Sequence, residues 1–247
     1  MKIVTIITPL YNAEKYISDT INSVLSQNYT NFEMIIVNDC STDNSEQIIL
    51  SFSDPRIKYF KFDKNQGVAT ARNYTLDSAK GRYITFLDAD DLLEPNYLEE
   101  QVKFIKDHGP IISSGYRRLA AHSNTPFYVP DRVTYKSIFR GNALSCLTTM
   151  YDFEVFKDVR FTSGYSRHED LIFWGDILSK GYIAYGNHKV LATYRIYNES
   201  RNGASKRKLI KPYLDILRKH YKFNYIKCWY LIFRMALYSK RKYRGVK

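Results

Sequence analysis

Apolar positions along the first half of the chain fall into two patterns that alternate. Continuous β-rich apolar runs predict buried strands at 3–8, 34–37, 57–60, 83–87 and 111–114. Helical spacing of apolar residues predicts helices at about 13–25, 43–50, 68–79 and 95–107. Strands that alternate with helices indicate βαβ units. We therefore expect an α/β fold with a mostly parallel, Rossmann-like sheet and helices on both faces.

Local signals mark where three of these helices begin. Asn12 is expected to cap the first helix, and Asp43 with Glu46 has the spacing of a capping box. Pro95 suits the first turn of the fourth helix.

The second half of the chain is less regular. Residues 117–165 show no clear period, 163–167 are predicted as a loop, and 169–180 as a helix that ends at Gly181. Two short strands are expected at about 182–185 and 189–195, and a basic helical pattern starts near 206.

Length and cysteine usage narrow the class of protein. The 247 residues suffice for one α/β domain with an appendage. The three cysteines are scattered without a C-x-x-C pair, which argues against a disulfide framework or a cysteine zinc site and favours a reducing cytosol. The N-terminal apolar run lacks a small-residue cleavage site, and no apolar run reaches about 18 residues. We therefore expect neither a signal peptide nor a transmembrane helix.

The basic excess of the chain is confined to its end. Residues 205–247 contain 14 Lys and Arg and one acidic residue, Asp215, whereas 1–204 contain 23 Lys and Arg and 24 Asp and Glu. Aromatic residues are interspersed with these cations, which is typical of a helix lying on an anionic membrane surface. The alternatives are a helical cap that packs on the domain with a basic solvated face, and a nucleic-acid surface. We expect no nucleic acid, because no nucleic-acid-binding module is recognisable.

Polar clusters follow three of the predicted strands, at 8–12, 38–41 and 88–91. In open α/β sheets, ligands bind beyond the carboxyl ends of the strands. We therefore expect these three clusters to converge.

The cluster after the fourth strand has the pattern of a cation site. Asp88 and Asp90 form an i, i+2 pair at a strand end, so both carboxylates project to one side. Mg²⁺ or Mn²⁺ takes one or two protein carboxylates, and phosphate oxygens and water complete its coordination. The alternative is that these residues cap the next helix and face water, and we assign Asp91 to that solvated or capping role.

Three blocks of the sequence resemble the inverting family 2 glycosyltransferases of the GT-A fold. They are TIITPLYNAEKYISDTINSVLSQNYTNFEMIIVNDCSTDNS, NQGVATARNYTLDSAKGRYITFLDADD and RHEDLIFWGDIL. The blocks occur in the order and spacing of the family, which is a far stronger signal than D-x-D alone. The resemblance implies a GT-A domain at 1–204, with a nucleotide-binding half at 1–116 and an acceptor-binding half at 117–204. Residues 205–247 are left as a basic, aromatic-rich helical tail.

The resemblance also implies a nucleotide-sugar donor, most often a UDP-sugar, with Mn²⁺ or Mg²⁺ as cofactor. Asp90 then corresponds to the metal ligand, and Asp88 contacts the ribose or assists the metal. The nucleotide-binding loop of the family is matched by Thr8, Pro9 and Tyr11. Tyr11 offers a ring on which a base can stack, with a partly buried aromatic staple as the alternative.

Two further positions match nucleotide contacts of the family. Asp39 corresponds to the residue that accepts the uracil N3–H, although Asn38 stands where relatives usually have a second acidic residue. Arg72 corresponds to an arginine that reaches the nucleotide or its phosphates. The alternatives are a turn residue for Asp39 and a salt bridge with neighbouring acidic residues for Arg72.

The general base is implied by the third block. Asp170 corresponds to the family's base and Glu169 to a residue that supports it or positions the acceptor, with an ordinary acidic first turn of a helix as the alternative. His168 is assigned to surface or packing. Near 191–200, relatives often read Tyr-Arg-x-His; Tyr197 replaces that histidine, and Arg195 is assigned to the diphosphate or to a structural role.

The expected activity is inverting transfer of a sugar from a UDP-sugar to a saccharide hydroxyl. The acceptor is expected to be lipid-linked, the pathway bacterial surface polysaccharide synthesis, and the location the inner face of the cytoplasmic membrane. A nucleotidyltransferase is the enzymatic alternative, since it too uses paired carboxylates and a metal, but it gives no reason for a base at Asp170. A non-catalytic sugar-nucleotide or membrane-surface binding module is the alternative from another class.

Overall fold

Ten strands form one mixed sheet in the computed structural model, which describes residues 3–121, 123–165, 167–197 and 207–242. The strands are β1 (Val4–Leu10), β2 (Phe32–Asn38), β3 (Ile57–Lys61), β4 (Tyr83–Phe86), β5 (Leu92–Leu93), β6 (Ile111–Ala120), β7 (Ser123–Phe127), β8 (Arg132–Val133), β9 (Thr149–Asp152) and β10 (Ala184–Arg195). Their main order is β3-β2-β1-β4-β9-β6-β10-β5, while β7 pairs with β6 and β8 with β10.

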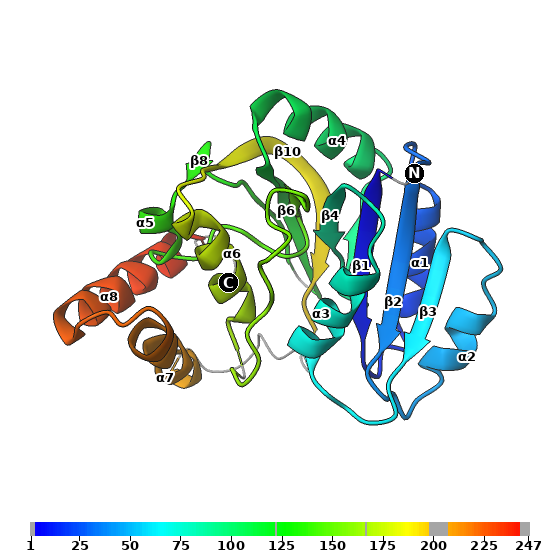
Figure 1. Cartoon of the computed structure of the whole chain (residues 1–247), viewed down its shortest axis with the longest axis horizontal. Coiled ribbons are helices and arrows are strands. Elements are labelled where there is room, and N and C mark those ends of the chain that lie inside the picture. The colour runs from blue at the N-terminus through cyan, green and yellow to red at the C-terminus, as the bar shows by residue number, and fades with distance from the viewer. Residues whose placement is uncertain (1–2, 122, 166, 198–206, 243–247) are drawn as a thin grey trace.

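Helices cover this sheet on both faces. They are α1 (Ile17–Leu25), α2 (Ser45–Leu50), α3 (Val68–Ser78), α4 (Tyr97–His108), α5 (Tyr135–Ile138), α6 (Glu169–Ser179), α7 (Arg207–Asp215) and α8 (Tyr225–Lys242), with a π-helical turn at Ile216–His220. Figure 1 shows α3 in front of the N-terminal strands and α1 behind them, while α6, α7 and α8 gather beside the second half of the sheet.

The N-terminal strands are parallel and contain the switch point of the sheet. In β1, Ile6 pairs with Met34 of β2 on one side and with Thr85 of β4 on the other. The chain thus builds outward from β1 in both directions, and ligands bind at such a reversal of strand order. Beyond β4, strands β9 and β6 join in antiparallel pairs, so the whole sheet is mixed rather than mostly parallel.

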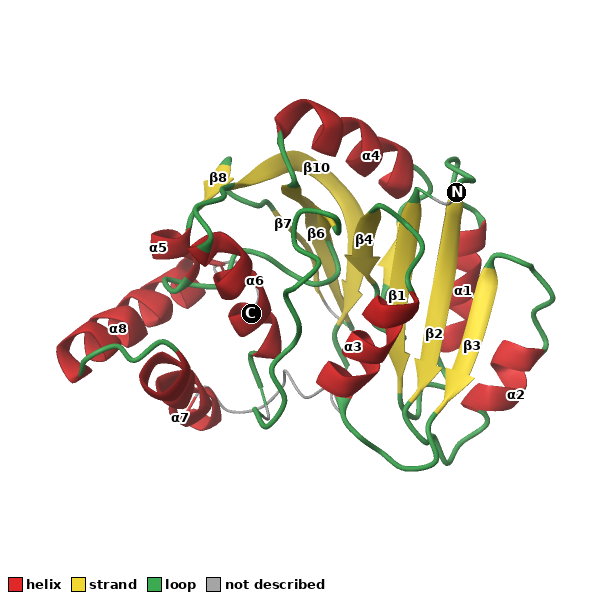
Figure 2. Cartoon of the chain, viewed as in Figure 1, coloured by secondary structure: helices red, strands yellow, loops and turns green. Residues whose placement is uncertain are grey.

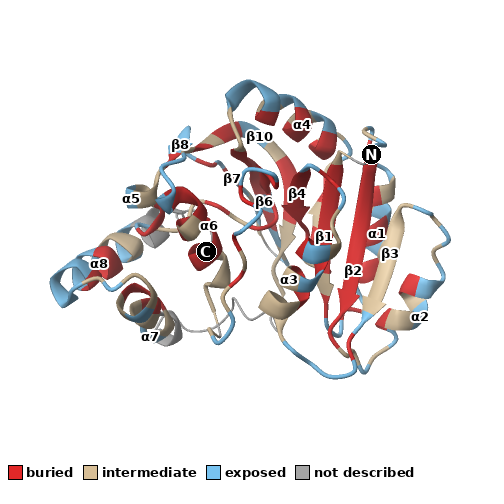
Figure 3. Ribbon diagram, in the orientation of Figure 1, coloured by how far each residue is buried: buried red, intermediate tan, exposed pale blue. Residues whose placement is uncertain are grey.

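Successive residues of the buried strands face two separate apolar cores. Ile6 packs in the core that includes α1 and α4, whereas Ile7 packs in the core that includes α3 and α6. This follows from the period of two along a strand, and it explains why each strand reads as a continuous apolar run. Figures 2 and 3 show the resulting layers, with buried strands between two helical faces.

The C-terminal helices pack onto the α6 side of the molecule. Their inner side chains are buried in the same core as Trp174 of α6; they are Tyr213, Leu217, Cys228, Leu231 and Ile232. The Tyr221 hydroxyl donates to the Ile172 carbonyl and lies within hydrogen-bond distance of Asp176. Gly175 leaves room for that hydroxyl, because a Cβ there would overlap it. None of the helices in the described part of the chain combines the length and apolar character needed to cross a bilayer.

The first helix begins later than its predicted cap. Helix α1 starts at Ile17, while Asn12 has a left-handed backbone with φ 50°. The Asn12 side chain instead accepts a hydrogen bond from the Thr42 N–H at 2.8 Å. The cap prediction was therefore wrong, because the side chain bonds to another loop rather than to its own helix.

The predicted capping box of the second helix does not form. Helix α2 starts at Ser45, and the Asp43 carboxylate accepts from the backbone N–H groups of Glu14 and Ser45. Glu46 pairs with Lys61 on β3 instead. Each of the two side chains therefore has a partner in a distant segment, Glu14 for Asp43 and Lys61 for Glu46.

The two strands expected near 182–185 and 189–195 are one strand, β10. It follows β6 throughout, with register shifts between Asn187 and Val190 and between Val190 and Thr193. Gly186 lies within β10, where the Pro130 carbonyl approaches so closely that a Cβ would overlap it. The absence of a side chain there allows close packing within the strand.

Candidate active site

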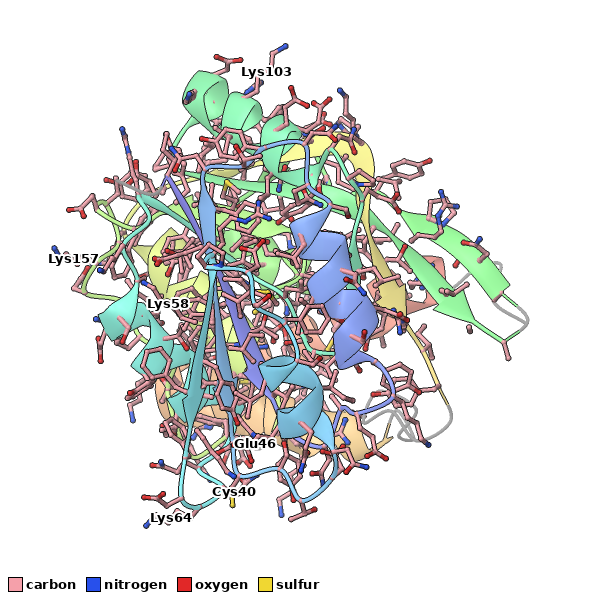
Figure 4. All side chains as sticks on the ribbon, turned by 90° about the vertical axis from the view of Figure 1, so that its right-hand side faces the viewer. Cys40, Glu46, Lys58, Lys64, Lys103 and Lys157 are labelled. Atoms are coloured by element: carbon pink, nitrogen blue, oxygen red, sulfur yellow. The ribbon has the colours of Figure 1, made fainter. Side chains whose placement is uncertain are left out.

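The loops that follow β1 and β2 are fastened to each other by hydrogen bonds. The Asn12 N–H donates to Ser41 Oγ at 3.0 Å, and the Ala13 N–H donates to Ser45 Oγ at 2.9 Å. Because β1 and β2 are parallel neighbours, both loops leave the sheet at the same edge. Figure 4 shows Cys40, which follows β2, and Lys64, which follows β3, together at this lower end of the molecule.

The three predicted residues of the nucleotide loop lie at the carboxyl end of β1. Thr8 and Pro9 belong to the strand, and Tyr11 lies in the loop just after it. Thr8 is fully buried, and among the described residues its Oγ1 has no hydrogen-bond partner. Tyr11 is 49% exposed, so about half of this residue is accessible to a ligand.

Asp39 is buried at the end of β2 and closes the loop before α3. Its two carboxylate oxygens accept from the Gln66 N–H at 2.6 Å and the Gly67 N–H at 2.8 Å. Gly67 has φ 87°, a conformation that favours glycine. An ionised carboxylate has about four acceptor sites, so Asp39 retains capacity for a further N–H donor.

The D-x-D turn follows β4, as predicted. The Asp88 side chain is 40% exposed, whereas Asp90 accepts a hydrogen bond from the Tyr197 hydroxyl at 2.6 Å. Burial, followed by the charge of Asp88, raises the pKa of the Asp90 carboxyl above its ordinary value. The turn therefore concentrates negative charge that a cation would stabilise.

Asp91 does not have the solvated role expected for it. It is buried, and one carboxylate oxygen accepts from the Arg195 N–H at 2.9 Å. Burial, with the charges of Asp90 and Asp88, raises the pKa of the Asp91 carboxyl well above its ordinary value. Asp91 therefore fastens the end of β10 to the D-x-D turn, a contact across 104 residues of sequence.

Arg72 joins the two acidic motifs. From α3, its guanidinium lies 2.8 Å from Asp88 Oδ1 and 3.2 Å from Glu169 Oε1. The Arg72 side chain is only 3% exposed, and it also lies over the ring of Phe161 at 5.1 Å. The salt bridge considered for Arg72 is therefore present. It brings the turn after β4 to the first turn of α6.

Asp170 is held at the start of α6 by a residue that sequence reasoning missed. Asn142 Nδ2 donates to Asp170 Oδ2 at 2.8 Å, and the Leu171 N–H donates to Asp170 Oδ1 at 2.8 Å. Burial, followed by the charge of Glu169, raises the pKa of the Asp170 carboxyl, whereas His168 lowers it. An oriented carboxylate with a raised pKa suits a general base.

Arg195 and Tyr197 lie beside the D-x-D turn at the end of β10. Arg195 pairs with Asp19 at 3.1 Å and lies over the Tyr16 ring at 5.4 Å. Tyr197 stacks on the same ring, with centroids 5.0 Å apart, and donates to Asp90. Arg195 thus has the contacts of the structural role that was its alternative. Tyr197 stands where relatives often have histidine, and its hydroxyl donates to Asp90, the predicted metal ligand.

The carboxylates after β4 fit a divalent cation bound jointly with a ligand. Asp88 and Asp90 supply two hard oxygen donors, and burial followed by the charge of Asp88 raises the pKa of the Asp90 carboxyl. Within the described ranges no cluster of three or more His, Cys, Asp or Glu is arranged to hold a metal. Two carboxylates fit the number of protein ligands that Mg²⁺ or Mn²⁺ takes when phosphate oxygens and water complete its coordination.

The fold and site together define a class. The mixed sheet with its β1/β4 switch point and the D-x-D turn after β4 are those of a GT-A glycosyltransferase fold. The chain belongs to glycosyl transferase family 2, whose model matches residues 5–166. That match ends just before Glu169 and Asp170.

Two relatives align with almost the whole chain. It is 38% identical over 229 residues to TuaG of Bacillus subtilis, whose name assigns it as a putative teichuronic acid biosynthesis glycosyltransferase, covering 89% of this chain and 90% of that protein. It is 33% identical over 235 residues to WfgD of Escherichia coli, named as a UDP-Glc:α-D-GlcNAc-diphosphoundecaprenol β-1,3-glucosyltransferase, covering 91% and 92%. Both alignments are long enough to relate whole proteins.

Solved structures support the fold. The S. aureus TarS 1–349 complex with UDP-GlcNAc superposes with a TM-score of 0.72 at 21% identity, covering 99% of this chain and 73% of that one. The mannosyltransferase PcManGT of Pyrobaculum calidifontis, in complex with GDP-Man and Mn²⁺, gives 0.69 at 18% identity, covering 90% and 64%. At these identities the likeness concerns the fold.

Removal of the Arg72 guanidinium is expected to destabilise the protein strongly. In Arg72→Gln, Asp88 and Glu169 lose their shared cation, and breaking a buried pair costs about 3 kcal/mol of the free energy of unfolding. Urea denaturation measures this loss. Lys61→Gln, which breaks the exposed pair with Glu46, is the matched control and should change stability little. Equal effects of the two substitutions would contradict a structural role for Arg72.

Proposed function

We propose that the chain transfers a sugar from a UDP-sugar to a hydroxyl of a lipid-linked saccharide, with inversion at the anomeric carbon, in bacterial surface polysaccharide synthesis. The observation that best supports this proposal is that one guanidinium, that of Arg72, forms salt bridges with both Asp88 and Glu169. It implies that the donor-binding turn and the base are neighbours. WfgD, named for a UDP-glucose donor and a diphosphoundecaprenol-linked acceptor, supports the substrate class.

The donor would bind across the carboxyl ends of β1, β2 and β4. Tyr11 offers an exposed ring for the base, and Asp39 has acceptor capacity left for the uracil N3–H. Thr8 is buried with a hydroxyl that is unpartnered among the described residues, so it would support the nucleotide loop from beneath rather than offer an open contact. Residues 1–116 would thus bind the nucleotide, while 117–204 supply Asn142, Glu169 and Asp170 on the acceptor side.

Arg72 and Arg195 are already paired with carboxylates. Arg72 would act on the donor through Asp88, which keeps an exposed side chain for the ribose. Arg195 would bind the diphosphate only if its salt bridge with the exposed Asp19 were replaced by a contact with a phosphate oxygen.

The chemical step is a single displacement. Asp170 takes the proton of the acceptor hydroxyl as its oxygen forms a bond to the anomeric carbon, on the face opposite the nucleotide. The bond from the anomeric carbon to the diphosphate oxygen breaks, and its electron pair leaves with UDP. When bound by Asp90 and Asp88, Mn²⁺ or Mg²⁺ would neutralise charge on that diphosphate. Asn142 keeps the Asp170 carboxylate in place.

Asp170→Asn is expected to abolish transfer without abolishing donor binding. An amide cannot take the proton, and loss of a general base lowers kcat by about 10²- to 10⁴-fold. Release of UDP with a lipid-linked GlcNAc acceptor measures turnover, proton NMR of the product gives its anomeric configuration, and calorimetry measures UDP affinity. Asp158→Asn, an exposed aspartate paired with Lys180, is the control and should retain activity. Full turnover in Asp170→Asn, or a retained configuration, would overturn the assignment.

Asp90→Asn is expected to weaken Mn²⁺ binding in the presence of UDP. The dissociation constant should rise about tenfold or more, because a loss of about 1.4 kcal/mol of carboxylate–cation attraction already gives that factor. EPR of free Mn²⁺ measures binding directly and does not depend on turnover. Asp107→Asn, at the exposed end of α4, is the control. If both variants bind Mn²⁺ as wild type does, the D-x-D turn is not the cation site.

We further propose that α8 docks on an anionic membrane. Its outer face carries a stripe of exposed apolar residues at helical spacing, which we call the outer stripe: Ile226, Trp229, Phe233 and Leu237. The opposite face, with Cys228, is buried against the domain. The strong excess of cations in 205–247 complements anionic lipid. A lipid-linked acceptor would be met at that surface.

Polar substitution of the outer stripe is expected to release the protein from vesicles. Trp229→Ser with Phe233→Ser should lower partitioning onto phosphatidylglycerol vesicles about tenfold or more, since about 1.4 kcal/mol of lost apolar burial suffices. Co-sedimentation measures the bound fraction. Leu50→Ser with Tyr128→Ser, two exposed residues on other elements, is the control. Unchanged binding of the outer-stripe variant would remove α8 as the docking face.

A further inference from the structure

A pocket lies between α5 and α8, on the side of the molecule that carries the outer stripe. It has a volume of about 230 Å³ and combines apolar side chains with three cations. The lining residues are Tyr135, Lys136, Phe139, Arg140, Phe223, Lys227, Tyr230 and Leu231. Its residues on α8 belong to the N-terminal half of that helix, and Figure 1 shows α5 and α8 on the same side of the molecule. We call this the α5–α8 pocket.

The apolar part of the pocket is closely packed around Phe139. Phe139 makes edge contacts with the rings of Tyr221 and Phe223, at centroid distances of 4.7 and 5.4 Å. The Tyr213 hydroxyl donates to the Phe139 carbonyl from α7. A buried aromatic floor held from three directions forms a fixed surface for an apolar ligand.

The polar part of the pocket is cationic without counter-charge. Its lining contains no Asp or Glu. None of the ion pairs among the described residues involves Lys136, Arg140 or Lys227. Asp176, which lies near Tyr135, is occupied by His220 and Tyr221. Three cations that share one pocket rim repel each other, so an anion bound there would relieve that repulsion.

The pocket lies close in sequence to the residue that holds the proposed base. Arg140 precedes Asn142 by two residues, a span of at most about 7 Å between Cα atoms. The Asn142 N–H donates to the Ile138 carbonyl at 2.8 Å, and the Asn142 side chain donates to Asp170. A molecule anchored at Arg140 would therefore lie near the segment that positions Asp170.

The pocket also opens onto the outer stripe. Tyr230 and Leu231 line it, and the exposed Trp229 and Phe233 lie on the same helix within one turn of Tyr230. An apolar chain attached to an anion in the pocket thus has a continuous aromatic path along α8. Of the anions that could neutralise the rim, one that carries a long apolar chain matches both features.

We propose that the α5–α8 pocket binds the diphosphate and first isoprene units of a polyisoprenyl-diphosphate-linked acceptor. Lys136, Arg140 and Lys227 neutralise the diphosphate, the aromatic floor receives the first isoprene units, and the rest of the chain follows the outer stripe into the bilayer. The inference rests on the proposed function. It adds the site that recognises the lipid end of the acceptor.

Farnesyl diphosphate is the probe that tests the site, because it is a soluble polyisoprenyl diphosphate and needs no bilayer. Calorimetry is run with saturating UDP so that the donor site is filled. The variant Lys136→Gln/Arg140→Gln/Lys227→Gln should bind the probe about 100-fold more weakly, at roughly tenfold or less per cation. The control, Lys103→Gln/Lys106→Gln/Lys222→Gln, makes the same charge change with exposed lysines, and should bind as wild type does. Figure 4 shows Lys103 at the opposite end of the molecule from Cys40 and Lys64.

Two further ligands show whether the diphosphate or the isoprene units supply the affinity for the probe. Inorganic diphosphate and farnesol should each bind far more weakly than farnesyl diphosphate, because each lacks half of the ligand. Equal affinity for inorganic diphosphate would reduce the pocket to a simple anion site and overturn the proposal. Equal affinity of the pocket variant and the control for farnesyl diphosphate, or no binding by wild type, would also overturn it.

Turnover separates this inference from the proposed function. The pocket variant should raise KM for a lipid-linked acceptor about 100-fold, and leave KM for the UDP-sugar unchanged. If the wild-type protein transfers sugar and the pocket variant has the same acceptor KM, the pocket inference fails and the function stands. If no sugar is transferred while probe binding is lost in the pocket variant, the function fails and the lipid-diphosphate site stands.

Discussion

The arrangement of the site depends on one buried guanidinium. Arginine stays protonated in proteins. Because the Arg72 side chain is almost completely removed from water, the folded chain must place carboxylates beside it to balance its charge. Asp88 and Glu169 supply them from segments 81 residues apart in sequence. Both pairs are needed at once, because the planar fork presents separate N–H groups to each carboxylate. The turn after β4 and the start of α6 are consequently fixed relative to each other before any substrate arrives.

This constraint reaches the C-terminal helices through α6. Residues of α6 at successive turns bond to different layers: Glu169 pairs with Arg72, Trp174 packs in the core, and Asp176 bonds to Tyr221 and His220. The missing side chain at Gly175 lets Tyr221 approach the helix. The first turn of α6 and the inner face of α8 are therefore parts of one packed unit. A surface bound by α8 would have a defined orientation relative to Asp170.

The sequence predicted what depends on local pattern and on the rules of parallel sheets. The apolar runs located β1, β2 and β4, and because these strands are parallel neighbours, the clusters beginning at Thr8, Asn38 and Asp88 had to leave the sheet at one edge. The acidic neighbourhood of Arg72 likewise indicates a salt bridge as the alternative to a nucleotide contact, and that salt bridge is present. Knowledge of strand direction was sufficient for these inferences, and no side-chain detail was required.

Contacts between distant segments escaped prediction for a physical reason. Asn12, Asp43 and Asp91 have side chains that suit local caps, yet each found partners in another loop or strand. A short polar side chain bonds whichever backbone N–H the fold brings near, and sequence spacing does not record that approach. Asn142 was missed for the same reason. Asparagine is typical of turns, and the structure gives Asn142 a left-handed backbone with φ 39°, but nothing in the neighbouring sequence points to its bond with Asp170.

The charges of the two proposed sites suit two anionic substrates. On the proposed function, donor and acceptor each carry a diphosphate, and two such groups near one reaction centre repel. The donor would be bound at Asp88 and Asp90, which are themselves anionic and would therefore need a cation between protein and phosphate. The acceptor diphosphate would be bound directly, by Lys136 and Arg140 of the near-neutral domain and by Lys227 of the cationic tail. Two diphosphates would thus be held at two kinds of site, one that binds phosphate through a metal and one that binds it without a metal, while their sugars meet.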